Sequence, residues 1–275
     1  MTPESGSSAG GIAGFVRRNQ IGVFVALAYA LSWWAWVWYR LDPENVGAPI
    51  LPIGPLLAAL ILLPLIGGWA AVKAWLAKIV LWRVGWIWYA VVLLVPVILT
   101  LSAYRINLMF GAKQVASFEM PSAIQIAVRF VFILLWIGLG EEPGWRGFAL
   151  PRLLNGRSAL VAALILGAIH MVWHAPLYGV EYDPSNVIPW GISVFCFSIV
   201  ICWIYLPTGG SVLMPMLMHA SNNTIALVWR RFEGDDQVRL WWIWCSLWVV
   251  TALVVVIATG KNLTRKAPSG HDEAT

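Results

Sequence analysis

The sequence predicts an all-α protein that crosses a membrane about eight times as a polytopic helical bundle. Of its 275 residues, 60% are hydrophobic and only 11% are charged, and the mean hydropathy is +0.76. A soluble chain carries about 25% charged residues, so this one lacks the polar side chains to cover a water-facing surface. Its apolar runs are long and continuous, unlike the alternating segments of about 10 residues in a β-barrel. A soluble enzyme, a disordered chain and a nucleic-acid binder are poor fits.

Four spans are expected in the first half of the chain. We interpret the first as an uncleaved span, because its apolar run continues past the cleavage-like Ala26-Leu27-Ala28 and exceeds the roughly 7–15 residues of a signal peptide. Lys73, Lys78 and Arg83 alternate with apolar residues, which predicts a short amphipathic segment on the lipid headgroups. The four expected spans are 21–39, a stretch within 46–72, 84–104, and about 122–140, which ends at Glu141-Glu142.

The second half is expected to contain four more spans. The stretch 184–229 has no formal charge in 46 residues and is too long for one crossing. Pro207-Thr208-Gly209-Gly210 is the turn signal that divides it. The remaining spans are 158–178 and 240–260.

The distribution of basic residues predicts the orientation. The net charge is +5, and 11 of the 18 Lys and Arg residues fall on the side of the expected spans that holds the N-terminus. Basic loops stay cytoplasmic, so we expect both termini to be cytoplasmic. We also expect the protein to lie in the plasma membrane. The expected organisation is a flexible tail (1–19), a single transmembrane domain (20–260) and a polar tail (261–275).

Ionisable side chains are expensive inside a bilayer, so those within expected spans indicate function. The first cluster is Gly140-Glu141-Glu142-Pro143-Gly144-Trp145-Arg146-Gly147. In a helix, Glu142 and Arg146 are one turn apart and can pair, which leaves Glu141 as the freer carboxylate and a candidate general base. Pro143 predicts a helix start or a kink. The alternative is an ordinary charged cytoplasmic loop.

Two further clusters carry imidazole and amide groups. His170 and His174 share a helix face in the fifth span, as do His219 and Asn223 in the seventh. The histidines can bind a metal, stabilise an oxyanion, or only satisfy a neighbouring carbonyl, and Asn223 can simply join two helices. If the three clusters converge, a carboxylate to take a proton from water and donors for an oxyanion suit amide hydrolysis.

These clusters resemble the signatures of the CAAX protease and bacteriocin-processing family (CPBP, or Abi) of intramembrane metalloproteases. The family patterns are E-E-x-x-x-R, F-x-x-x-H and H-x-x-x-N/D. Here they are Glu141 to Arg146, His170 to His174, and His219 to Asn223. The residues within these motifs are close to those of the bacterial branch. The resemblance covers about residues 138–223. It implies an eight-span membrane-embedded endopeptidase that acts on a peptide or membrane-protein substrate.

The resemblance also implies roles for the residues. Glu141 would activate water, His174 would help to hold it, His219 and Asn223 would stabilise the oxyanion or complete a metal site, and Arg146 would orient the glutamates. His170 stands where the family usually has a large apolar or aromatic residue, and we favour packing over an added metal ligand for it. Glu141, His174 and His219 would hold a Zn²⁺ ion if one is bound, although the same residues also suffice for a metal-independent mechanism.

Two other functions use the same residues. The first is a non-catalytic immunity or scaffold protein that retains the fold. The second is a proton-coupled transporter in which the Glu/His cluster relays protons.

Overall fold

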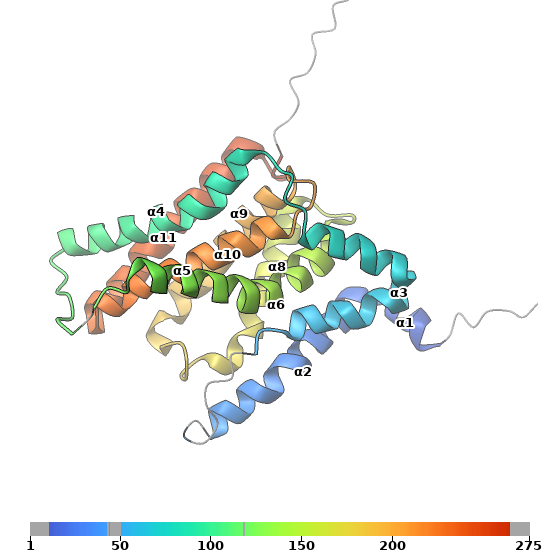
Figure 1. Ribbon diagram of the computed structural model, residues 1–275, viewed down its shortest axis with the longest axis horizontal. Coiled ribbons are helices and arrows are strands. Elements are labelled where there is room, and N and C mark those ends of the chain that lie inside the picture. Colours follow the sequence, from blue (N-terminus) through green and yellow to red (C-terminus); the bar gives the residue numbers. More distant parts are fainter. Residues whose placement is uncertain (1–10, 43, 45–50, 118, 265–275) are drawn as a thin grey trace, which may run out of the picture.

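The protein is a bundle of α-helices (Figure 1). The computed structural model describes residues 11–42, 44, 51–117 and 119–264, and within them the only β-type pairing is an isolated bridge between Tyr178 and Tyr182. This confirms the predicted all-α class. The helices are α1 (Ile12–Arg18), α2 (Gln20–Leu41), α3 (Gly54–Ile79), α4 (Trp86–Met109), α5 (Ala123–Phe132), α6 (Leu139–Glu142), α7 (Leu150–Leu154), α8 (Ala159–Trp173), α9 (Val187–Tyr205), α10 (Leu213–Ile225) and α11 (Gly234–Thr259).

Shorter helical pieces join these elements. Two are π-helical, η1 (Ile133–Gly138) and η2 (Pro143–Ala149), and they link α5, α6 and α7 into one helical stretch. Three are 3₁₀-helical: η3 (Ala175–Leu177), η4 (Pro184–Asn186) and η5 (Ala226–Arg231).

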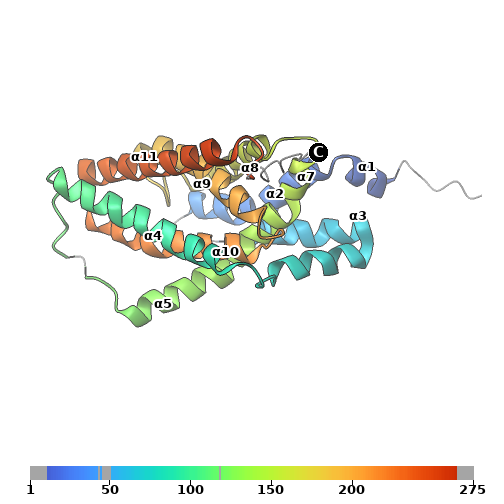
Figure 2. The same ribbon diagram turned by 90° about the horizontal axis from the view of Figure 1, so that it is seen from above.

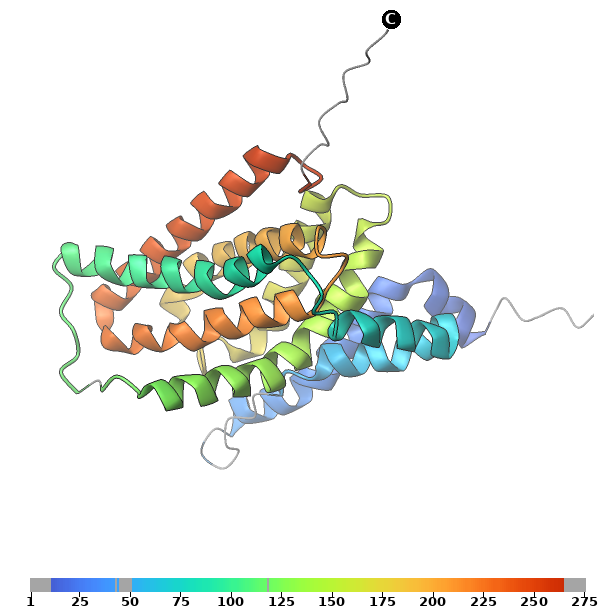
Figure 3. The ribbon, with the colours of Figure 1, turned by 45° about the horizontal axis from the view of Figure 1, so that its top comes forward.

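Seven helical segments of the described chain are long and apolar enough to cross a membrane, against about eight expected. The expected span that is absent from these seven is the seventh, which corresponds to α10; this helix has 13 residues and is continued by η5. It is short on apolar residues because it carries His219, Asn222 and Asn223. Figure 3 shows α10 lying between α4 and α5, so neighbouring helices surround these polar side chains.

Helix α3 joins the second expected span to the expected amphipathic segment, and it does not run straight. Gly67 and Gly68 leave the helical conformation, and Gly68 has φ +63° and ψ −164°, a region that is essentially open only to glycine. The halves 54–66 and 69–79 therefore run in opposite directions from this turn (Figure 2). Lys78 secures the returning half, because its Nζ donates to Gly209 O at 2.6 Å.

The fourth expected span was predicted to end at Glu141-Glu142, and this boundary is wrong. The chain stays helical from Ala123 to Leu154. Pro143 has no N–H to donate, and the wider π-helical turn that begins there accommodates it without ending the helix. Both glutamates consequently lie within a membrane-spanning helix and not in a loop.

The expected terminal tails lie partly outside the described residues. Residues 1–10 and 265–275 are not described. Within the expected N-terminal tail, Ile12–Arg18 forms the short helix α1.

The turned-back helix α3 packs tightly against the helix that carries the glutamates. A β-carbon added to Gly144 would lie 2.4 Å from Pro55 O, and one added to Gly140 would lie 2.9 Å from Pro52 O. Glycine at both positions therefore lets the two backbones approach closely. The EE-x-G part of the motif is thus explained by packing as well as by chemistry.

We predict that Gly144→Ala destabilises the fold by about 1–3 kcal/mol, because the new methyl group overlaps the Pro55 backbone. The measurement is thermal unfolding in detergent. Gly22→Ala in α2 is the matched control, since an added β-carbon there meets no heavy atom of the described chain within 4 Å. A Gly144→Ala protein as stable as this control would contradict the close contact.

Candidate active site

The two adjacent glutamates of α6 are buried inside the bundle. Glu141 is 3% exposed and Glu142 is fully buried. The π-helical segments η1 and η2 flank them, and such widened turns are frequent at functional sites. Trp75 of α3 donates from Nε1 to the backbone oxygen of Pro143 at 2.9 Å, so the returning half of α3 fixes the turn that follows the glutamates.

Glu142 has a cation and an imidazole as partners. Arg146 Nη1 lies 3.0 Å from both carboxylate oxygens of Glu142, which confirms the predicted pair. His219 Nδ1 lies 2.8 Å from Glu142 Oε1 and brings α10 into the same cluster. Because both oxygens of Glu142 are used by these partners, this residue is a structural anchor for Arg146 and His219.

Glu141 has a different environment, formed by the C-terminal end of α8. Its Oε2 lies 3.0 Å from His170 Nε2. His174 Nδ1 lies 3.0 Å from the backbone oxygen of His170 and donates to it. Since Nδ1 of His174 carries the donated hydrogen, Nε2 is the nitrogen that remains available as an acceptor or ligand.

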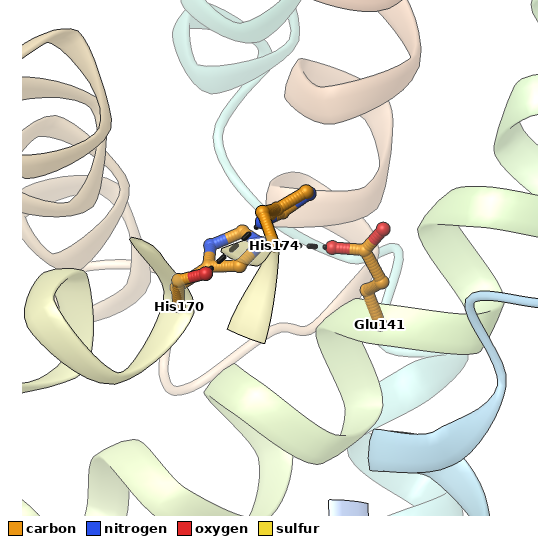
Figure 4. A group of neighbouring side chains, drawn as sticks. All are labelled: Glu141, His170 and His174. Carbon is orange, nitrogen blue, oxygen red and sulfur yellow. Dashed lines mark hydrogen bonds and ion pairs between the residues drawn. The ribbon is translucent and has the colours of Figure 1, made fainter. Parts of the chain in front are cut away.

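These three side chains form a compact group that could hold a metal ion (Figure 4). Glu141, His170 and His174 each offer one ligand atom, and the atoms all lie within 4.8 Å of one another. Two imidazole nitrogens and one carboxylate oxygen are a donor set that zinc uses in catalytic sites. The chemistry of the residues present therefore fits zinc.

The structure changes two expectations about this set. His170 was expected to be a packing residue, but its Nε2 contacts the Glu141 carboxylate directly. His219 was expected beside Glu141 and His174 as a metal ligand, but its ring is bonded to Glu142. The candidate metal group therefore contains His170 in place of His219.

Asn223 lies one turn beyond His219 on α10. Its side-chain oxygen accepts a hydrogen bond from Asn222 Nδ2 at 3.2 Å, and its backbone oxygen accepts one from Arg129 Nη2 at 3.2 Å. Its expected part in stabilising an oxyanion stays a prediction.

Helix α2 positions the two histidines of α8, which sequence reasoning missed. Tyr29 Oη donates to Ile169 O at 2.5 Å, and Trp33 Nε1 donates to Trp173 O at 2.8 Å. Trp173 is the last residue of α8, and its carbonyl has no partner within the helix. Helix α2 supplies that partner through Trp33. The spacing of four residues between Tyr29 and Trp33 was the only sequence signal, and aromatic residues at this spacing also occur on lipid-facing helices.

Aromatic side chains that follow α8 surround His174. The ring centroids of Tyr182 and Trp190 lie 5.9 and 5.1 Å from that of His174. Burial raises the pKa of the Tyr182 hydroxyl, and the negative charges of Glu141 and Glu181 raise it further. Tyr182 therefore stays a neutral O–H donor beside the site. Sequence reasoning placed Tyr182 in a connecting loop and assigned it no role.

The fold and the site together define a polytopic membrane protein with a buried glutamate and histidine cluster. A sequence model of the type II CAAX prenyl endopeptidase Rce1-like family matches residues 123–225, which contain all three motifs. CAAX prenyl protease 2 of Methanococcus maripaludis is 28% identical over 145 residues, which cover 48% of this chain and 53% of that protein. The chain thus spans about half the length of this curated relative. The segment that carries the motifs is therefore similar to the Rce1-like family, and these matches support the resemblance drawn from the motifs.

We predict that Arg146→Met destabilises the protein by about 3–5 kcal/mol, because it leaves the Glu142 carboxylate buried without its cation. Thermal unfolding in detergent measures the loss. Arg157→Met is the control: Arg157 is exposed, and a surface substitution changes stability by only about 0.5 kcal/mol. Equal stability of the two variants would contradict the claim that the buried pair of Arg146 and Glu142 stabilises the fold.

Proposed function

We propose that the protein is an intramembrane endopeptidase in which Glu141 activates the water that attacks a peptide bond. The observation that carries the proposal is the buried pairing of Glu141 with His170 beside His174, inside helices that are apolar enough to cross a membrane. The similarity of residues 123–225 to the Rce1-like family supports a proteolytic function. A buried carboxylate among imidazole groups has the means to move a proton where lipid would otherwise exclude water.

The proposed reaction uses the residues of this chain as follows. Glu141 takes a proton from a water molecule while the water oxygen bonds to the carbonyl carbon of the peptide. When the tetrahedral intermediate collapses, the carbon–nitrogen bond breaks and the leaving amine receives the proton from Glu141. His170 holds Oε2 of the carboxylate at 3.0 Å and so orients Glu141 for both transfers.

The remaining groups hold the water and the developing negative charge. In this proposal His174 binds the water through Nε2, since its Nδ1 is bonded to the His170 carbonyl. Glu142 accepts a hydrogen bond from Nδ1 of His219 and so fixes the ring. In this proposal His219 is the doubly protonated imidazolium, whose Nε2–H donates to the oxyanion, with Asn223 as the second donor. Arg146 acts indirectly, by holding Glu142 in place.

A zinc ion is the candidate cofactor. Glu141, His170 and His174 would hold it, and it would supply Lewis-acid polarisation and a more acidic bound water. Glu142, Arg146 and His219 form a separate ion-pair network that maintains the shape of the site with or without the ion.

The proposed substrate is a peptide or membrane protein that reaches the site from the bilayer or the cytoplasm. We propose the plasma membrane as the location, with both termini on the cytoplasmic side. The basic residues Arg17, Arg152 and Lys261 support this orientation, because basic loops stay cytoplasmic.

Glu141→Gln is predicted to lower the rate of peptide cleavage by at least about a hundredfold, because an amide cannot accept the proton from water. Stability should change little, since a glutamine can keep the hydrogen bond to His170. The assay is cleavage of a lipid-embedded peptide library, with prenylated and unprenylated members, by the protein in liposomes.

Glu181→Gln is the matched control for this experiment, because Glu181 is an exposed carboxylate after α8. Substantial residual cleavage by the Glu141→Gln protein would show that another residue is the general base. A wild-type protein that cleaves no member of the library but carries a pH-driven flux would support the transporter instead.

Metal dependence is predicted to follow the Glu141, His170 and His174 group. If a zinc ion occupies this group, elemental analysis should find about one zinc per chain, and chelation should lower both zinc content and cleavage. His170→Phe should also lower the zinc content, which is measured without any activity assay. Full cleavage by a protein shown to contain no metal would favour the metal-independent glutamate mechanism.

A further inference from the structure

The charges of the protein are segregated along the bundle. Helices α2 and α8 begin at the same end of the molecule, because the side chain of Gln20 at the start of α2 is bonded to Arg152 of α7, which directly precedes α8. Helix α11 finishes there, since Leu160 N donates to Lys261 O at 2.9 Å. Among the described residues this end carries basic side chains without acidic ones, whereas acidic groups stand at the opposite ends of these helices. The acidic residues at the opposite ends include Asp42, Glu181, Asp183, Asp235 and Asp236.

A cavity of about 310 Å³ opens at the basic end, between the start of α2 and helix α7. Three arginines line it, and no acidic residue of the described chain does. The first residues of α2 also line the cavity, and their backbone N–H groups have no acceptor within the helix. The polar residues that line the cavity are Arg17, Arg18, Asn19, Gln20, Arg152 and Asn155.

Arg152 is held in a defined position at the wall of this cavity. Its Nε donates to Gln20 Oε1 at 2.6 Å, and its Nη1 donates to Phe148 O at 2.7 Å. The guanidinium carbon lies 3.6 Å from the centroid of the Phe148 ring. A guanidinium has five N–H donors, so these two bonds leave donors for a ligand, and a fixed side chain loses little freedom when a ligand binds.

From these observations we propose that the cavity binds the phosphate headgroup of an anionic phospholipid. Guanidinium groups bind phosphate oxygens through two parallel hydrogen bonds. A cavity lined by positive side chains also attracts an anion. A lipid is favoured over dissolved phosphate because Phe15 of α1 is 56% exposed one turn before Arg18. An exposed apolar ring next to a cationic cavity matches the boundary between headgroups and acyl chains. This site does not depend on the proposed proteolysis.

The test compares lipid binding by matched variants of the full chain in detergent. Short-chain phosphatidylglycerol and phosphatidylcholine are added, and bound lipid is measured by native mass spectrometry and by the rise in unfolding temperature. The variants are Arg17→Gln and the double change Arg17→Gln/Arg18→Gln. The double change Arg157→Gln/Lys261→Gln is the control, since it removes equal charge from the same end of the molecule outside the cavity lining.

We expect the wild type to prefer phosphatidylglycerol, and each arginine removed from the cavity to weaken its binding about fivefold. The control should bind as the wild type does. Equal losses in the control would show a diffuse surface potential and overturn the site, as would equal binding of the two lipids. Inorganic phosphate that displaces phosphatidylglycerol at equal concentration would overturn the assignment to a lipid.

Discussion

The structure depends on keeping two adjacent carboxylates inside a low-dielectric helix bundle. A carboxylate that leaves water loses several kcal/mol of solvation, and only close partners offset this. The partners of Glu142 are Arg146, one turn away, and His219 on α10. The partner of Glu141 is His170 on α8. Three separate segments must therefore meet at one place. That requirement fixes how α6, α8 and α10 pack, and it brings together the groups that the proposed chemistry uses.

Close backbone packing makes this meeting possible. The glycines of the glutamate motif admit the turned-back helix α3, and Trp75 of α3 then bonds to the Pro143 carbonyl. Near the end of α8, Tyr29 and Trp33 of α2 bond to the backbone oxygens of Ile169 and Trp173. Both supports act on the backbone next to a reactive side chain. They hold Glu141 and the histidines in position without using the polar atoms of those side chains.

The asymmetry between the two glutamates has a functional consequence. Glu142 is committed to Arg146 and His219, so its charge is neutralised within the fold. Glu141 lies within reach of two imidazoles and of the aromatic group that contains Tyr182. Glu142 is thus held in the ion-pair network, and Glu141 is left for the proposed chemistry. Adjacent residues on a helix can differ in this way because they point in different directions.

The sequence by itself determined the membrane class, the approximate spans, the Glu142–Arg146 pair and the family resemblance. These follow from composition, from continuous apolar runs and from contacts one helical turn apart, all of which are local. Tertiary structure alone decided that α3 turns back at Gly67-Gly68, that the helix continues through Pro143, and that His170 joins Glu141 while His219 joins Glu142. Local patterns place side chains on a face of their own helix. Which helix that face meets depends on packing between segments far apart in the chain.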